Sequence, residues 1–275
     1  MEDAHISMPS FLCSSSKLVD LASSKSAPLH FFGVLDGHGG EACAEYCGDA
    51  LPKQLKKSLS SGLPISASLV TAHAAVEVDW FREADRDDSG TTAVTALIES
   101  ASGRVLASNV GDSRVLVVRR SGKSGSKVVA LTRDHDGNNK QEAKRIKVAH
   151  GEIDQDGYIN RGLTSTCVGV QTARSLGDFD VKYPIDDEDD GHFHSASVIC
   201  TPELEWCDLE DDDILVLGCD GLFEASEGSA VWIGKMVRKL EAQEYTAQDT
   251  AEALAQEAID MGSGDNVSVI VVKPS

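Results

Sequence analysis

Strands and helices fall into separate blocks along this chain, and that grouping limits the folds it can adopt. Short strand patterns, joined by turns such as Ser102-Gly103, form a meander predicted at 91–99, 104–109, 114–119 and 127–131, with a hairpin loop at 121–126. Further strands are predicted at 196–200, 203–207, 213–219 and 266–273. Helical periodicity predicts helices at 40–60, 66–85, 140–150, 226–241 and 246–261. Short antiparallel strands without strict strand–helix alternation indicate an α+β protein in which one sheet packs on another.

Three aspartates stand where an apolar strand meets a glycine. They are Asp36 after Phe31-Phe32-Gly33-Val34-Leu35, Asp220 after Leu215-Val216-Leu217-Gly218-Cys219, and Asp265 after Gly262-Ser263-Gly264. A carboxylate at the end of a buried strand is held rigidly, and a neighbouring glycine lets another group approach the backbone. Several desolvated acids in one place are costly unless a cation neutralises them. Oxygen ligands of this kind suit Mg²⁺ or Mn²⁺, so the chain is predicted to be a metal-dependent enzyme.

The chain has enough apolar material for a large core. Its 275 residues are 41% hydrophobic, and no linker or internal repeat divides them, so we expect a single domain over 1–275. Residues 152–195 lack periodicity and are rich in Gly and Asp. A flap of loops over the site is therefore expected within 133–195.

The formal net charge of −20 and the pI near 4.7 argue against partners that are bound through Lys and Arg. Nucleic acid and anionic membrane surfaces are both of this kind, so neither is expected as a partner. Two acidic runs, 186–190 and 210–213, are expected to be solvated loop surface. The histidines other than His38, including His192 and His194, are expected to face solvent.

The cysteines number seven and are irregularly spaced. Cys43 and Cys47 share a helical face, but no second Cys or His pair completes a zinc site, so buried free thiols in a reducing compartment are expected. No apolar stretch has the length of a membrane span, and residues 1–5 lack the features of a secretory signal. We therefore expect a cytoplasmic or nuclear protein, with a monomer as the default.

Short segments spread over nearly the whole chain form an ordered set. They are Met1-Glu2-Asp3-Ala4-His5, Val34-Leu35-Asp36-Gly37-His38-Gly39-Gly40, Ser89-Gly90-Thr91-Thr92-Ala93, Asn109-Val110-Gly111-Asp112-Ser113-Arg114, Leu131-Thr132-Arg133-Asp134-His135, Ala173-Arg174-Ser175-Leu176-Gly177-Asp178, Cys219-Asp220-Gly221-Leu222-Phe223 and Gly264-Asp265-Asn266-Val267-Ser268-Val269-Ile270. In this order they resemble the metal-dependent serine/threonine protein phosphatases of the type 2C, or PPM, family. One Asp-Gly pair would carry no information, whereas the ordered set is very specific.

The resemblance implies a fold and a metal centre. The fold is a central antiparallel β-sandwich flanked by α-helices on both sides, in four layers α-β-β-α, with two Mg or Mn ions in a cleft at one end of the sheets. Asp36 would bridge both ions. Glu2 and the carbonyl of Gly37 would complete one site, and Asp220 and Asp265 would complete the other.

The resemblance also implies the roles around that centre. Asp3 would bind a water on one ion, and Asp112, Asp220 and Glu224 would hold a weaker third ion. Water readied between the two ions would attack phosphorus directly, without a covalent phosphoenzyme, and His38 would give a proton to the leaving alkoxide. The cysteines are not expected to act as nucleophiles, because none lies in a Cys-x5-Arg phosphate loop or beside clustered positive charge.

Each candidate residue also has a structural interpretation. Asp36 alone could cap the following helix, and His38 could bond to backbone, although we favour the metal and acid roles. Asp112 could form a turn, and Glu224 could be a surface acid before the helix at 226; for these two residues both interpretations stay open. Arg174 is expected to be structural, paired with a buried acid such as Asp178.

Two departures from the family pattern give rise to alternatives. Family members usually carry a phosphate-gripping Arg shortly before the segment that matches Met1-Glu2-Asp3, and they commonly show Asp where Glu224 stands. The leading hypothesis is a phosphatase that acts on phosphoserine and phosphothreonine in protein substrates. The first alternative is a weak or inactive relative that binds a phosphoprotein. The second is a non-catalytic protein that uses its acidic loops as a cation sink.

Overall fold

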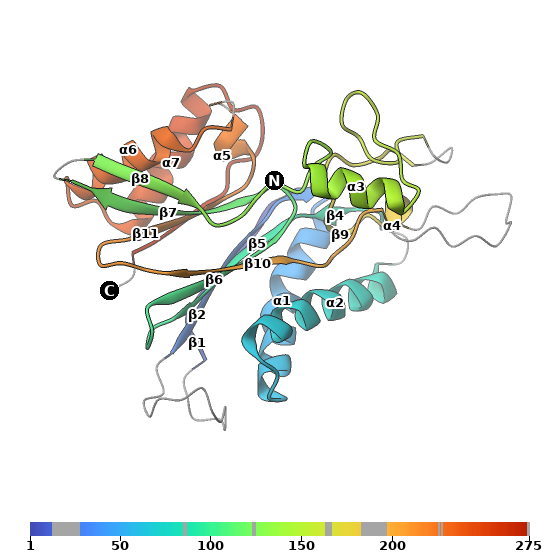
Figure 1. Cartoon of the computed structure of the whole chain (residues 1–275), viewed down its shortest axis with the longest axis horizontal. Coiled ribbons are helices and arrows are strands. Elements are labelled where there is room, and N and C mark those ends of the chain that lie inside the picture. Colours follow the sequence, from blue (N-terminus) through green and yellow to red (C-terminus); the bar gives the residue numbers. More distant parts are fainter. Residues whose placement is uncertain are drawn as a thin grey trace, which may run out of the picture.

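The computed structural model describes residues 1–12, 28–84, 87–122, 125–162, 167–182, 197–224, 226 and 228–273. Two antiparallel sheets form its centre (Figure 1). The first has the order β1 (Ala4–Leu12), β2 (Leu29–Leu35), β5 (Ala93–Glu99), β6 (Arg104–Val110) and β10 (Glu203–Asp208). The second has the order β12 (Val269–Val272), β11 (Ile214–Gly218), β7 (Arg114–Ser121) and β8 (Gly125–Ala130).

Alternating side chains along the strands build separate apolar layers. On β7, Val115 and Val117 point between the sheets, while Leu116 and Val118 join the core on the other face. This alternation follows from the two-residue repeat of a strand, and both faces are apolar because both are covered. One apolar layer thus fills the space between the two sheets. Each of two further apolar layers lies between one sheet and its pair of helices.

Helices cover the outer face of each sheet (Figure 1). The helices α1 (Ala42–Ser60) and α2 (Ile65–Glu83) lie on the side of the first sheet, while α6 (Val231–Glu241) and α7 (Ala247–Asp260) lie on the second. Thr246 and Asp249 form a capping box that starts α7. The predicted α+β sandwich with helices on both sides is confirmed.

A small third sheet joins three distant segments beside the ends of the large sheets. Its strands are β3 (Gly37–His38), β4 (Gly90–Thr91) and β9 (Leu176–Gly177), in that order. The short helix α4 (Phe179–Lys182) follows β9, α5 (Gly221–Glu224) follows β11, and α3 (Lys140–Val148) lies in the expected flap. Asn139 caps α3 by accepting hydrogen bonds from the backbone of Gln141 and Glu142.

Some predicted elements are wrong in extent or kind. The described part of the predicted strand at 196–200 forms only an isolated bridge between Ile199 and Arg174. The predicted helix at 226–241 starts only at Val231, because the backbone at Gly228 takes a positive φ that a helix does not allow. The hairpin loop is shorter than expected, since Ser121 already pairs with Gly125. The last strand covers only Val269–Val272.

The acidic runs and cysteines have mixed outcomes. Asp213 is buried and pairs with Arg119 at 3.2 Å, so the solvated interpretation of 210–213 is wrong at this residue. The run 186–190, His192, His194 and Cys13 lie outside the described residues. His73 and His135 are buried, so the prediction that the remaining histidines face solvent is wrong for these two. Cys43 and Cys47 are buried free thiols, as expected, with their Sγ atoms 3.8 Å apart. Among the described residues, no helix combines the length and the apolar character required to cross a bilayer.

Candidate metal centre and active site

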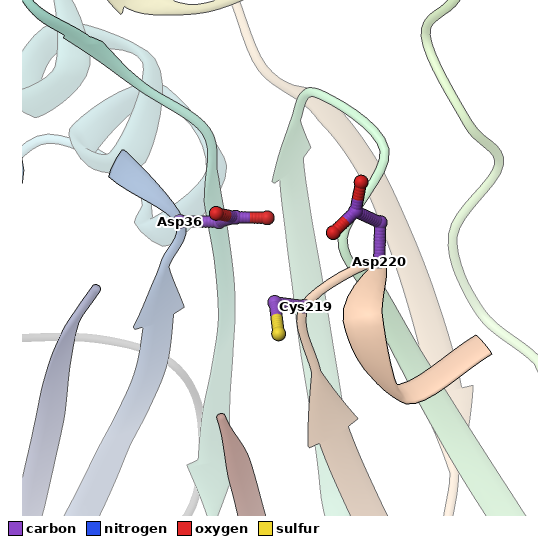
Figure 2. A group of neighbouring side chains, drawn as sticks. All are labelled: Asp36, Cys219 and Asp220. Atoms are coloured by element: carbon purple, nitrogen blue, oxygen red, sulfur yellow. The ribbon is translucent and has the colours of Figure 1, made fainter. Parts of the chain in front are cut away.

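Carboxylates from both large sheets converge at one end of the sandwich. Asp36 directly follows β2 of the first sheet, and Asp220 lies between β11 of the second sheet and α5. Figure 2 shows the two carboxylates pointing toward each other across the gap between the strands. One ligand atom each from Asp36, Asp220 and Cys219 lies within 4.8 Å of the others. Residues that are 184 positions apart (220 − 36) thus form one cluster.

Hydrogen bonds with Thr91 and Thr92 fix the backbone of Asp36. The Thr92 amide donates to the Asp36 carbonyl at 2.9 Å, and the Thr91 hydroxyl donates to the same oxygen at 3.0 Å. The Asp36 amide donates back to Oγ1 of Thr92 at 3.3 Å. Because α1 has Glu41 as its N-cap residue, Asp36 does not cap that helix, and its carboxylate stays available for the site.

A second group of acids adjoins the first through Asp220. Oxygens of Asp220, Glu224 and Asp265 lie within 4.8 Å of one another, with the last two side chains exposed. Gly221 is required here because a Cβ at this position would overlap the carbonyl of Asn266. Glu224 is exposed, as the surface-acid interpretation expected, but it ends α5 and does not start a helix at 226.

The first residues of the chain lie against the same cluster. Ala4 of β1 pairs with Leu35 of β2, which places Asp3 beside Asp36 at the end of the sheet. A Cβ on Gly37 would overlap the carbonyl of Glu2, so the glycine allows the close approach of these two segments. The Glu2 amide donates to Oδ1 of Asn266 at 3.3 Å, which ties this end of the chain to the second sheet.

The electrostatics of the cluster favour a bound cation. Burial, together with the neighbouring charges of Asp220 and Asp3, raises the pKa of Asp36 to about 10. Burial also raises the pKa of Asp220. Within the described part of the chain, neither carboxylate oxygen of Asp3 has a hydrogen-bond partner, although both are buried, and the same holds for Oδ1 of Asp220. Unpartnered buried carboxylates that repel one another fit a divalent cation.

Asp112 lies in the turn between β6 and β7, close to this cluster. Burial and the charges of Asp220 and Asp134 raise its pKa to about 7. Burial, followed by the charges of Asp220 and Asp265, also raises the pKa of Glu224. Both residues therefore experience the shared negative field, as expected for the outer acids of a cation site.

His38 has a partner that the sequence did not reveal. Its Nε2 lies 2.8 Å from Oδ1 and 2.9 Å from Oδ2 of Asp178, so the ring is not bonded to backbone through this nitrogen. Burial alone would lower the pKa of His38, but the attraction of Asp178 raises it above its ordinary value. Arg174 pairs instead with Glu142 at 2.6 Å. The structural role of Arg174 is confirmed, and the predicted partner is wrong.

Comparison with known proteins identifies the family. A protein-family model described as "Protein phosphatase 2C" matches residues 1–267. The chain belongs to the protein phosphatase 2C family.

Curated relatives of this phosphatase family resemble the chain along almost its whole length. It is 31% identical over 275 residues to a "Probable protein phosphatase 2C 22" of Arabidopsis thaliana, and the match covers 99% of this chain and 64% of the relative. It is 30% identical to "Protein phosphatase 2C homolog 2" of Schizosaccharomyces pombe, over 99% of this chain and 69% of that protein. The chain thus spans less than two thirds of the length of the Arabidopsis relative.

Solved structures share the fold. A structure described as a C. elegans sex determining protein superimposes with a TM-score of 0.73 at 23% identity, covering all of this chain and 61% of that chain. A phosphatase from Toxoplasma gondii superimposes with a TM-score of 0.72 at 21% identity, covering 98% of this chain and 91% of that chain. The fold of this chain is therefore shared with these two solved structures.

Cys219 is a neighbour of the acids that the site predictions had left out. Its thiol donates to the Asn266 carbonyl at 3.2 Å and accepts from the Ser268 amide at 3.1 Å. Burial raises the pKa of this thiol, so it stays protonated at neutral pH and is a poor metal ligand or nucleophile. Its place just before Asp220 was visible in the sequence. Its hydrogen bonds to Asn266 and Ser268, which hold that loop against β11, join segments far apart in the sequence, so the sequence did not reveal them.

Proposed function

We propose that this protein is a metal-dependent serine/threonine phosphatase that hydrolyses phosphoserine and phosphothreonine in protein substrates. The observation that carries the proposal is the convergence of Asp36 and Asp220 from opposite sheets, with buried carboxylate oxygens that lack partners. Membership of the protein phosphatase 2C family supports the same chemistry. Phosphoprotein substrates and a monomeric state remain part of the proposal.

The acids would hold the ions in overlapping sets. Asp36 would be shared by two Mg or Mn ions, with Glu2 and the Gly37 carbonyl on one side and Asp220 and Asp265 on the other. When bound, divalent ions at such a site supply Lewis acidity toward water and toward phosphate oxygens. Asp3 would accept a hydrogen bond from a water at this cluster, and its two buried carboxylate oxygens, which have no partner among the described residues, support this role.

An outer position would take a weaker third ion. Asp112, Asp220 and Glu224 are its ligands in this proposal. The support is the raised pKa of Asp112 and of Glu224, which reflects the negative field that a further cation would relieve. Glu reaches further than Asp, so the exposed position of Glu224 at the end of α5 suits a ligand that extends toward the cluster.

In this proposal the nucleophile is water and not a cysteine side chain. Burial raises the pKa of the Cys219 thiol beside the acids, so no thiolate is available there for a phosphoenzyme. Water would attack phosphorus as the ester P–O bond breaks. His38, whose side chain is 34% exposed, would give its proton to the serine or threonine oxygen and regain one from solvent.

The test is turnover of a phosphothreonine peptide and of p-nitrophenyl phosphate with and without Mn²⁺. Asp36→Ala and Asp220→Ala should each lose at least about 10²-fold in kcat/KM, because each removes charge from the metal cluster. Asp211→Asn, an exposed acid in the turn before β11, is the matched control and should keep wild-type rates. Absence of turnover with metal in excess would contradict the proposal and favour the phosphoprotein-binding alternative.

Calorimetry separates the cation-sink alternative. The proposed centre predicts a few tight Mn²⁺ sites that disappear in Asp36→Ala and persist in Asp211→Asn. A sink made of acidic loops predicts many weak sites that are insensitive to Asp36. The family match lends no support to either alternative.

A further inference from the structure

The small sheet brings Asp178 to His38 across a glycine. In β3–β4–β9, His38 pairs with Gly90 on one side and Gly177 pairs with Gly90 on the other. Asp178 directly follows Gly177, and its carboxylate passes over Gly90 to reach the imidazole. A Cβ on Gly90 would overlap that carboxylate, so only glycine leaves room for the contact.

The backbone around Asp178 is held in an uncommon conformation. Asp178 has a φ of 54°, in the left-handed region that residues other than glycine seldom adopt. Its amide donates to the Ser89 carbonyl at 3.3 Å, and its own carbonyl accepts from the amides of Val181 and Lys182, the last two residues of α4. The surrounding contacts thus determine where its carboxylate points.

A buried ion pair anchors the turn that carries Asp178. Lys182 donates to Glu77 of α2 at 2.5 Å and to the Ser175 carbonyl at 2.8 Å. The other Glu77 oxygen accepts from the Gly177 amide at 3.0 Å. Gly177, directly before Asp178, and Lys182, four residues after it, are therefore both bound to the Glu77 side chain of α2.

We propose that Asp178 is a positioning residue for His38: by accepting from Nε2–H it fixes the orientation of the ring and leaves Nδ1 as the nitrogen that gives the proton to the leaving oxygen. The Asp178 side chain is 3% exposed and that of His38 is 34% exposed, so the carboxylate stays inside while the ring reaches the open site. The inference rests on the proposed function, because it assigns a partner to the proposed acid.

The activity test compares substrates that differ in their need for an acid. An alkoxide from phosphothreonine must be protonated, whereas p-nitrophenolate leaves without a proton. Asp178→Gly removes the carboxylate and tolerates the positive φ, and it should lower kcat for a phosphothreonine peptide by about 10²-fold but kcat for p-nitrophenyl phosphate by less than about fivefold. Asp178→Asn keeps an acceptor oxygen but not the charge that favours the protonated ring, and its amide can also donate to Nε2, so it should recover only a small part of the loss. KM should change little.

Further variants sharpen the assignment. His38→Ala should show the same substrate split, and the double variant His38→Ala/Asp178→Gly should lose no more than His38→Ala alone, because both act through one proton transfer. Asp180→Asn, two residues further along in α4, is the matched control and should behave as wild type. Multiplicative losses in the double variant, or equal losses on both substrates, would overturn the inference.

A spectroscopic readout is independent of turnover and of metal. In ¹⁵N-histidine-labelled wild-type protein, the neutral His38 ring should carry its proton on Nε2, and this preference should be lost in Asp178→Gly. An Nδ1–H tautomer in the wild type would refute the inference even if the variant fails to fold. Wild-type protein that lacks metal-dependent turnover of either substrate would instead refute the proposed function, and the inference with it.

Discussion

At the scale of single residues, the acids that suit a cation destabilise the protein without one. The pKa of Asp36 is raised from 3.8 to about 10, so at pH 7 its carboxyl is protonated when folded and ionised when unfolded. The stability that this group contributes is present below pH 3.8 and is lost as the pH rises toward 10. Asp36→Asn should therefore stabilise the metal-free protein at pH 7 by about 2 to 4 kcal/mol.

Urea unfolding in EDTA checks this prediction. The advantage of Asp36→Asn over wild type should shrink between pH 7 and pH 5, since the wild-type penalty fades as the unfolded carboxyl also becomes protonated. Asp211→Asn, which is exposed, should give no such pH-dependent gain. A metal-free Asp36→Asn protein less stable than wild type at pH 7 would contradict the repulsion described here.

His73, which is buried in α2, provides the opposite pH dependence. It is fully buried in α2, its Nδ1 lies 2.8 Å from the Leu69 carbonyl, and burial lowers its pKa to about 4. Its contribution to stability is complete above pH 6.5 and is lost as the pH falls toward 4, because only the unfolded imidazole gains a proton there. Relative to His73→Gln, the wild type should lose about 2 kcal/mol of unfolding free energy between pH 7.5 and pH 5. A constant difference across that range would show that the ring can be charged in place.

At the scale of elements, the Glu77–Lys182 pair joins α2 to the β9–α4 turn. The Lys182 side chain is 1% exposed and that of Glu77 is 10% exposed, so removing one partner leaves a buried charge. Lys182→Met should cost about 3 to 5 kcal/mol in urea unfolding. Adding Glu77→Gln should restore part of that loss, because the amide oxygen can still accept from Gly177 without an unpaired charge. A double variant as unstable as the sum of the two single variants would argue against this coupling.

Elements with a local signal were predictable from the sequence, whereas the contacts between them were not. The helix predicted at 40–60 is α1 at Ala42–Ser60, because its apolar periodicity lies within the segment itself. Strand ends likewise pointed to Asp36 and Asp220. The small sheet has strands of only two residues, which carry no periodic pattern, so nothing in the sequence showed that Asp178 would reach His38 rather than Arg174. Asp213 was misassigned because its partner Arg119 is 94 positions away, so no local pattern indicated the ion pair.

At the scale of the whole molecule, the candidate centre connects the two sheets. Glu2, Asp3 and Asp36 belong to the end of the first sheet, and Asp220 and Asp265 to the end of the second. A cation held by both groups would bind the folded protein and not the unfolded chain. Stability should therefore rise with Mn²⁺ concentration, by about 2.7 kcal/mol at one hundred times the dissociation constant.

Thermal unfolding against Mn²⁺ concentration measures this linkage, and hydrogen exchange locates it. The increase in Tm should vanish in Asp36→Ala and Asp265→Ala and persist in Asp211→Asn. NaCl at the same ionic strength should give a much smaller increase, because it only screens the net charge of −20. Amides at the end of β2 and at the start of β12 should gain protection together, since one cluster holds both sheets. Protection confined to one sheet would mean that the ion does not bridge the sandwich.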